Sequence, residues 1–259
     1  MNPVGDVAVI IAAKDEGDRI AATVTAASGL PGVDLVIVVD DGSADDTYAA
    51  ATGAGATVVR HARNRGKAAA METGAEAVRL LERRDGREVP RHLLFLDGDL
   101  AATAKEAAPL IDPVRAGSAD MTIAVFPATR LKLGGHGFVQ RLARDGIRRA
   151  TGWTAAQPLN GQRCLTRAAF EAARPLAPGF GVETGLTIDL LRQGHRVTEV
   201  EVALEHRATG TDWRAQVHRA RQFADVSRAL ADRELRPALV RRARRLQAKL
   251  SGARRGGSW

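Results

Sequence analysis

Short apolar runs alternate with longer amphipathic segments along the first half of the chain. Residues 7–13, 35–39 and 92–96 form continuous apolar runs. Such runs are typical of strands that are buried on both faces, as in a parallel sheet. We expect two further strands at 57–60 and 121–126. The segments between them have helical periodicity at 18–28, 45–53 and 68–83. Strands that alternate with helices predict an α/β fold with a doubly wound, mostly parallel sheet.

The pattern changes after residue 126. Residues 129–137 are basic and glycine-rich, which favours a loop, and 157–161 and 175–181 are turn-rich. A strand is expected at 196–204, and helices at 138–150, 167–173, 182–193 and 213–231. We therefore divide the chain into residues 1–125, a second half of the same domain at 126–232, and a C-terminal tail at 233–259.

Composition is that of a globular protein. The 259 residues are 45% hydrophobic and 26% charged, enough for one large domain with a real core. No apolar run reaches the roughly 18 residues that span a bilayer, and the first residues do not resemble a signal peptide. Cys164 is the only cysteine, which excludes an intrachain disulfide and a cysteine zinc cluster. We expect a cytoplasmic protein.

The net charge of +8 comes from the tail. Eight basic residues, the first of which is Arg236, lie in this tail, and no acidic residue follows Glu234. Without those eight, 30 of the 38 basic residues remain and balance the 30 acidic ones. This distribution does not favour nucleic-acid binding.

Leucines recur at helical spacing in the tail. The tail is therefore either a solvated helix that packs through its leucines or a basic amphipathic helix on an anionic membrane.

The candidate chemistry begins at Leu96-Asp97-Gly98-Asp99, directly after an apolar run. Residues i and i+2 of an extended segment point the same way, so both carboxylates can reach one hard cation that prefers oxygen ligands. Taken alone, the motif is also an ordinary Asp-Gly turn.

Two other polar motifs follow predicted strands. Residues 38–47 combine acids, a glycine turn and a helix cap, for which Ser43 or Asp45 is the candidate. The spare carboxylates suit a base ring or a ribose. Residues 64–67, Asn-Arg-Gly-Lys, open a helix and suit a diphosphate. All these residues fall at carboxyl ends of strands, where such sheets bind ligands.

In this order the motifs resemble the family 2 glycosyltransferases with the GT-A nucleotide-sugar fold. The matching segments are 10–16, 39–47, 64–67 and 96–99, although Ala12 stands where the family usually has proline. The resemblance implies that residues 1–125 bind the nucleotide sugar. It places Ala12, Lys14 and Glu16 around the nucleoside, Asp41 at the base and Lys67 near the nucleotide. It also assigns Asp97 and Asp99 to Mg²⁺ or Mn²⁺ on the diphosphate.

Residues 157–162 and 177–186 are similar to segments of glucosyl-3-phosphoglycerate synthases. This similarity implies that 126–232 binds the acceptor, that Glu183 approaches the donor sugar, and that His206 completes the metal site beside Arg207. Two departures stand out. The chain has Gln162 where those enzymes usually have glutamate, and residues 134–139 lack the arginine and threonine of their acceptor loop.

The resemblance thus predicts a metal-dependent hexosyltransferase that uses a UDP- or GDP-sugar, with Glu183 and Asp99 as catalytic residues. The acceptor is not identified, and a small phosphorylated acid such as phosphoglycerate is one candidate. Alternatives are a polyprenyl-phosphate glycosyltransferase at the inner membrane face and a non-catalytic nucleotide-sugar-binding protein. A homodimer is a candidate assembly, and the loop at 129–137 is a candidate lid over the donor.

Overall fold

A single seven-stranded sheet organises the protein, in the order β3-β2-β1-β4-β6-β5-β7. The computed structural model describes residues 6–127, 137–204 and 220–233. The strands are β1 Val7–Ala13, β2 Val33–Asp40, β3 Thr57–Arg60, β4 His92–Asp97, β5 Met121–Val125, β6 Arg163–Leu165 and β7 Val197–Glu201. Strand β6 runs antiparallel to both its neighbours, β4 and β5, and the other pairs are parallel.

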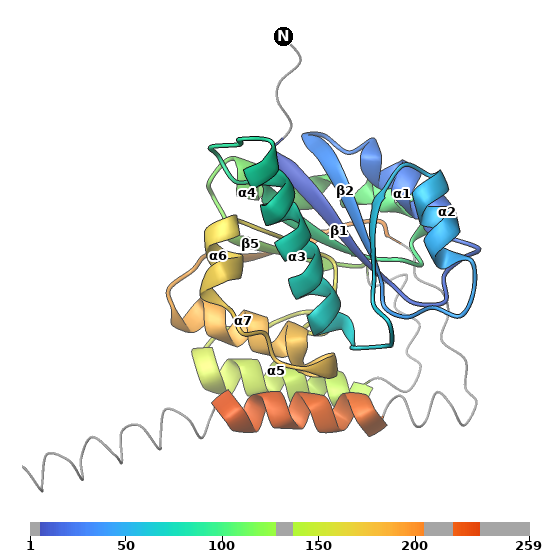
Figure 1. Cartoon of the computed structure of the whole chain (residues 1–259). Helices are drawn as coiled ribbons and strands as arrows, with labels where there is room; N and C mark the ends of the chain where they lie inside the picture. The colour runs from blue at the N-terminus through green and yellow to red at the C-terminus, as the bar shows by residue number, and fades with distance from the viewer. Residues whose placement is uncertain (1–5, 128–136, 205–219, 234–259) are drawn as a thin grey trace, which may run out of the picture.

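Helices cover both faces of this sheet (Figure 1). They are α1 Ile20–Ser28, α2 Thr47–Gly53, α3 Lys67–Arg84, α4 Asp112–Arg115, α5 Gly137–Thr151, α6 Arg167–Ala172 and α7 Val182–Arg192, with 3₁₀ segments η1 Ala101–Leu110 and η3 Gly179–Gly181. Residues 220–233 form a further helix. Helix α3 crosses one face together with α6 and α7, whereas α1 and α2 lie on the other.

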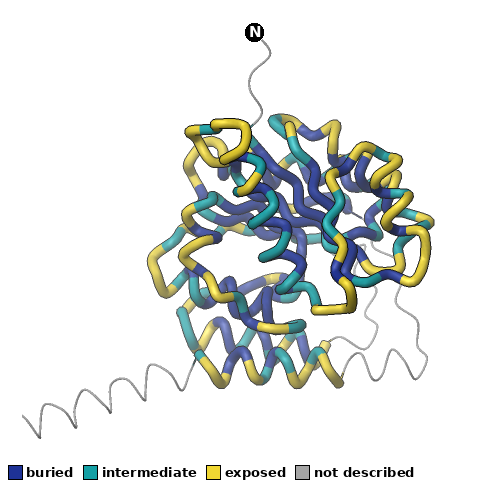
Figure 2. Tube along the Cα trace, in the orientation of Figure 1, coloured by how far each residue is buried: buried dark blue, intermediate teal, exposed yellow. Residues whose placement is uncertain are grey.

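The alternation of side chains along the central strands divides the core into two. Val9 and Ile11 of β1 pack with Leu94 and Leu96 of β4 on the α1 side. Their neighbours, such as Ile10, pack under α3, α6 and α7 on the opposite side. Both faces are therefore buried, which accounts for the continuous apolar runs, and Figure 2 shows these strands as the buried centre of the molecule.

A third apolar cluster joins α5, α7 and the helix at 220–233, which lie together in Figure 1. Val139, Ile147, Ile188, Val226 and Leu230 are its largest buried aliphatic side chains. This cluster attaches the 220–233 helix to the element that begins with Val182 and Glu183.

The predicted α/β architecture is confirmed, and so is every strand and helix expected within the described residues. Four elements were missed: β6, η1, η3 and α4. Helices α1 and α2 each begin two residues later than expected. Within the described residues, no helix is long and apolar enough to cross a membrane. Most of the basic loop and all of the tail after residue 233 lie outside these residues.

Candidate functional site

The strand register brings the candidate residues to one edge of the sheet. Ala12 pairs with Val39 on one side and with Asp97 on the other, so the chain segments after β1, β2 and β4 are adjacent. A cavity of about 480 Å³ lies at this edge. It is lined by Ala12, Ala13, Lys14, Asp41, Asn64, Gly66, Lys67, Ala70, Asp97, Gly179, Phe180 and Arg221.

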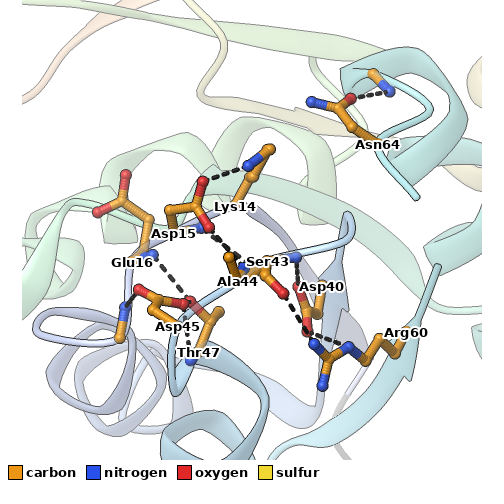
Figure 3. Close-up of polar contacts among 12 residues, drawn as sticks. Lys14, Asp15, Glu16, Asp40, Ser43, Ala44, Asp45, Thr47, Arg60 and Asn64 are labelled. Atoms are coloured by element: carbon orange, nitrogen blue, oxygen red, sulfur yellow. Dashed lines mark hydrogen bonds and ion pairs between the residues drawn. The ribbon is translucent and has the colours of Figure 1, made fainter. Parts of the chain in front are cut away.

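The loops after β1 and β2 are tied together by hydrogen bonds (Figure 3). The Asp15 amide donates to Ser43 Oγ at 2.9 Å, and Asp15 Oδ1 accepts the Ala44 amide at 2.8 Å. The Glu16 amide donates to Thr47 Oγ1 at 2.9 Å. Asp15 has a φ of 56°, a left-handed conformation that aspartate tolerates better than most residues. These bonds fix the backbone between Lys14 and Glu16.

The prediction that Ser43 or Asp45 caps α2 is wrong, because the N-cap residue is Asp46, which makes no side-chain cap hydrogen bond. Asp45, one residue earlier, accepts the Thr47 amide at 3.1 Å. Asp45 also accepts the Gly17 amide at 2.9 Å. Hydrogen bonds from Thr47 and then Gly17 lower the pKa of the Asp45 carboxyl. Ser43 instead links the two loops, because its backbone binds Asp40 while its hydroxyl binds Asp15.

Asp41 is buried and holds the loop that precedes α3. Its Oδ1 accepts the Arg65 amide at 2.8 Å and lies 2.7 Å from His61 Nδ1, while its Oδ2 accepts the Gly66 amide at 2.8 Å. His61 Nε2 in turn lies 3.0 Å from Thr73 Oγ1. Asp41 was expected to bind the nucleotide base. Most of its lone pairs instead accept hydrogen bonds from this loop and from His61, although its side chain still lines the cavity.

Lys67, Asp97 and Glu183 converge from three separate elements. Lys67 Nζ lies 2.6 Å from Asp97 Oδ1 and 3.2 Å from Glu183 Oε1. Burial alone would lower the pKa of this ammonium, but the two carboxylates outweigh it and raise the pKa above its ordinary value. A Cβ on Gly161 would lie 2.0 Å from Nζ, so a larger residue there would displace the Lys67 ammonium. Gln162 Nε2 donates to Asp97 Oδ2 at 2.7 Å.

The turn that carries Asp97 and Asp99 is held by α1. Thr23 Oγ1 lies 2.9 Å from the Gly98 carbonyl and accepts the Ala101 amide at 2.8 Å. Arg19 donates to the Asp99 carbonyl at 3.1 Å. Ala101 adopts a φ of 48°, which is strained for a residue with a Cβ. Thr23 thus stabilises both ends of a strained turn.

The donor set suits a hard divalent cation. Asp97 and Asp99 are half-buried and supply carboxylate oxygens at the end of β4. Glu16 lies beside them, since a Cβ on Gly98 would be 3.4 Å from its Cγ. Among the described residues, no three His, Cys, Asp or Glu side chains are grouped to hold a metal ion. The expected third ligand, His206, and its neighbour Arg207 lie outside the described residues.

Sequence reasoning missed Arg163, a fully buried side chain in β6. It donates to the carbonyls of Asn160 at 2.9 Å, Pro158 at 3.1 Å and Glu183 at 3.1 Å. Burial lowers the pKa of its guanidinium to about 10. Arg163 connects the turn before Gln162 to the first turn of α7. Thr23, His61 and Arg221 were also missed, and no pattern in the sequence marks them.

Residues 8–171 match the family model described as "Glycosyl transferase family 2". The chain belongs to this family. This match covers more than half of the sequence and includes every motif up to Gln162. The expectation of a family 2 glycosyltransferase is therefore confirmed.

Two curated relatives of this family 2 chain were found. It is 31% identical to glycosyltransferase AglJ of Haloferax volcanii over 184 residues, which are 68% of this chain and 56% of the relative. It is also 31% identical to glucosyl-3-phosphoglycerate synthase of Mycolicibacterium paratuberculosis over 200 residues, 71% of this chain and 59% of the relative. The chain thus spans less than two thirds of each relative.

The fold is shared with a solved structure of glucosyl-3-phosphoglycerate synthase from Mycobacterium tuberculosis. That structure is in complex with Mn²⁺, UDP-glucose and phosphoglyceric acid. The TM-score is 0.67 at 26% identity, and the match covers 88% of this chain and 79% of the other. The predicted GT-A fold is confirmed.

Proposed function

We propose that this family 2 chain is a metal-dependent hexosyltransferase that uses a nucleoside diphosphate sugar and a small phosphorylated acceptor. The proposal is carried by Lys67 and Asp97, which line the cavity, together with Glu183, which is paired with Lys67. The similar mycobacterial enzyme, which binds Mn²⁺, UDP-glucose and phosphoglyceric acid, supports it.

The nucleoside is assigned to the wall formed by the loops after β1 and β2. Ala12, Lys14 and Asp41 line the cavity there, and Glu16 lies next to Gly98. Asp41 Oδ2 has capacity for one more hydrogen bond, which suits a ring N–H of uracil or guanine. The loop that Asp41 holds leads directly into α3, whose N-terminus favours a diphosphate.

Asp97 and Asp99, with His206, would hold Mg²⁺ or Mn²⁺. When bound, such an ion offsets the negative charge that develops on a departing diphosphate. Lys67 provides fixed positive charge in the same place, and Arg207 is assigned to the same task.

Glu183 is assigned to the donor sugar. It lies in the first turn of α7 and is only 8% exposed. Its carboxylate can hydrogen-bond sugar hydroxyls or accept the proton of an acceptor hydroxyl. A phosphate acceptor needs little deprotonation near pH 7, because its second pKa is about 6.

A thermal-shift screen with UDP- and GDP-sugars tests donor binding. A ligand at 100 times its Kd stabilises a protein by about 2.7 kcal/mol, so the correct donor with Mn²⁺ or Mg²⁺ raises Tm by several degrees. Asp99→Asn should lose the metal-dependent part of this shift. Glu106→Gln, at a half-buried acid on η1 that does not line the cavity, is the matched control. Equal shifts in all three proteins would refute the metal role of Asp99.

Transfer of radiolabelled hexose separates the catalytic alternatives. Product on 3-phosphoglycerate supports the proposal, and product only on a polyprenyl phosphate points to the membrane-surface alternative. Donor binding without transfer to either acceptor, and without donor hydrolysis, would identify a nucleotide-sugar-binding protein instead.

A further inference from the structure

Most charged side chains that line the cavity are already paired. Lys14 forms an ion pair with Asp15, and Lys67 is held between Asp97 and Glu183. Asp41, the other acid lining the cavity, accepts two backbone amides and contacts His61. Among the described residues that line the cavity, Arg221 is the one charged side chain with no oppositely charged partner within the described chain.

Arg221 is carried by a helix that is firmly docked. Asp225 Oδ2, one turn further on, accepts the Phe180 amide at 3.0 Å. A Cβ on Gly181 would lie 2.7 Å from both Ala229 Cβ and the Asp225 carbonyl, so this close approach requires glycine. Leu230 and Val226 anchor the same helix in the third apolar cluster. The helix therefore holds the Arg221 backbone in place against η3.

The position of Arg221 is on the Glu183 side of the cavity. Its neighbours there, Gly179 and Phe180, belong to η3, which leads directly into the first turn of α7 and Glu183. Figure 1 shows the 220–233 helix running along α5, below α7, on the side away from β2 and α2. The nucleoside, by contrast, is assigned to the loops after β1 and β2.

We propose that Arg221 binds the anionic group, phosphate or carboxylate, of the acceptor. This inference rests on the proposed function and assigns a residue to the acceptor that it names. Asp97, Asp99 and Glu183 together with a diphosphate outweigh the charges of Lys67, Arg207 and one divalent cation, so the donor-loaded site stays formally negative. An anionic acceptor needs a further cation, and the guanidinium fork matches phosphate and carboxylate oxygens.

The test measures donor and acceptor separately on the full chain. Arg221→Ala removes the charge, Arg221→Lys keeps it without the fork, and Arg228→Ala is the matched control. Arg228 is exposed on the same helix and does not line the cavity. The donor readouts are the Kd of UDP with Mn²⁺ and the rate of UDP-glucose hydrolysis without acceptor. The acceptor readouts are KM for 3-phosphoglycerate and for glycerol 3-phosphate.

Arg221→Ala should raise the KM for 3-phosphoglycerate by about 10- to 100-fold, the worth of one hydrogen bond to a charged group. An equal rise in the KM for glycerol 3-phosphate, which has no carboxylate, would show that Arg221 binds the phosphate, and an unchanged KM for glycerol 3-phosphate would show that it binds the carboxylate. The acceptor KM of Arg221→Lys should lie between the values of the wild type and of Arg221→Ala. The Kd of UDP should stay at the wild-type value in all variants. An unchanged KM for 3-phosphoglycerate, or an equal loss of UDP affinity, would overturn the assignment. Wild-type protein that binds UDP with Mn²⁺ but glucosylates neither acceptor would also overturn it, while the donor site would stand. Failure to bind any nucleotide sugar would overturn both proposals.

Discussion

Lys67 is the residue at which the two halves of the sequence meet. Its ammonium joins Asp97, from the first half, to Glu183, from the second. Folding raises the pKa of this group. As long as Asp97 and Glu183 are ionised, its stabilising effect is therefore complete below the ordinary lysine pKa of about 10.4 and is lost as the pH rises through the folded-state value. The pairing thus persists throughout the physiological range.

Thr23 offers a prediction at the same scale. Thr23→Val keeps the shape of the side chain but leaves the Gly98 carbonyl and the Ala101 amide without their hydroxyl partner. We expect a loss of about 1–3 kcal/mol in the free energy of unfolding, together with weaker Mn²⁺ binding in the presence of UDP. Urea unfolding and isothermal titration measure the two effects.

Thr23→Ser is the control for this experiment, because it keeps the hydroxyl and should retain both properties. Ala101→Gly removes the Cβ that makes φ 48° unfavourable, so it should recover about 1 kcal/mol of stability in the Thr23→Val background. Unaltered stability in Thr23→Val would show that the turn does not depend on α1.

Strand β6 is short, but it positions several groups of the candidate site. It has three residues, yet it joins β4 to β5 and directly follows Gln162, which binds Asp97. Its Arg163 spans the carbonyls of the preceding turn and of Glu183. One short strand therefore positions groups on both sides of the cavity.

Arg163→Lys should disturb this arrangement while keeping a positive charge. An ammonium cannot reach all the carbonyls that the guanidinium fork binds, so at least one buried acceptor is left unpaired at a cost of about 1–3 kcal/mol. We expect a lower Tm and a reduced transfer rate, measured by calorimetry and steady-state kinetics. Arg196→Lys, at an exposed ion pair with Asp120, is the control. A wild-type rate in Arg163→Lys would mean that Glu183 does not depend on β6.

The long elements were predictable because their patterns are strong. Continuous apolar runs marked β1, β2 and β4, and the residues after them fell at one sheet edge, so the site could be located from sequence. Strand β6 could not be predicted, because three residues that begin with a buried arginine show no period. Thr23 and His61 act through hydrogen bonds to distant segments, and only the folded chain reveals such contacts.

For the whole molecule, the uneven charge leads to a prediction about membranes. The eight basic residues from Arg236 onward lie outside the described residues. If they contact anionic lipid, the full chain should co-sediment with phosphatidylserine vesicles at low salt and be released as salt screens the attraction. Removal of residues 236–259 should abolish sedimentation without altering UDP binding. Equal partition of both proteins would refute membrane contact.

The cytoplasmic location and the homodimer expected from the sequence also stay predictions.

The antiparallel insertion of β6 has a consequence for how the chain folds. Strand β4 ends at residue 97, but its outer neighbour arrives only with residues 163–165, and β5 joins the rest of the sheet only through that strand. Until then the apolar edge of β4 is unpaired, which favours association with other chains. Pairings so distant in sequence form slowly. We infer that emergence of β6 from the ribosome ends the period in which the nascent chain is most prone to aggregate.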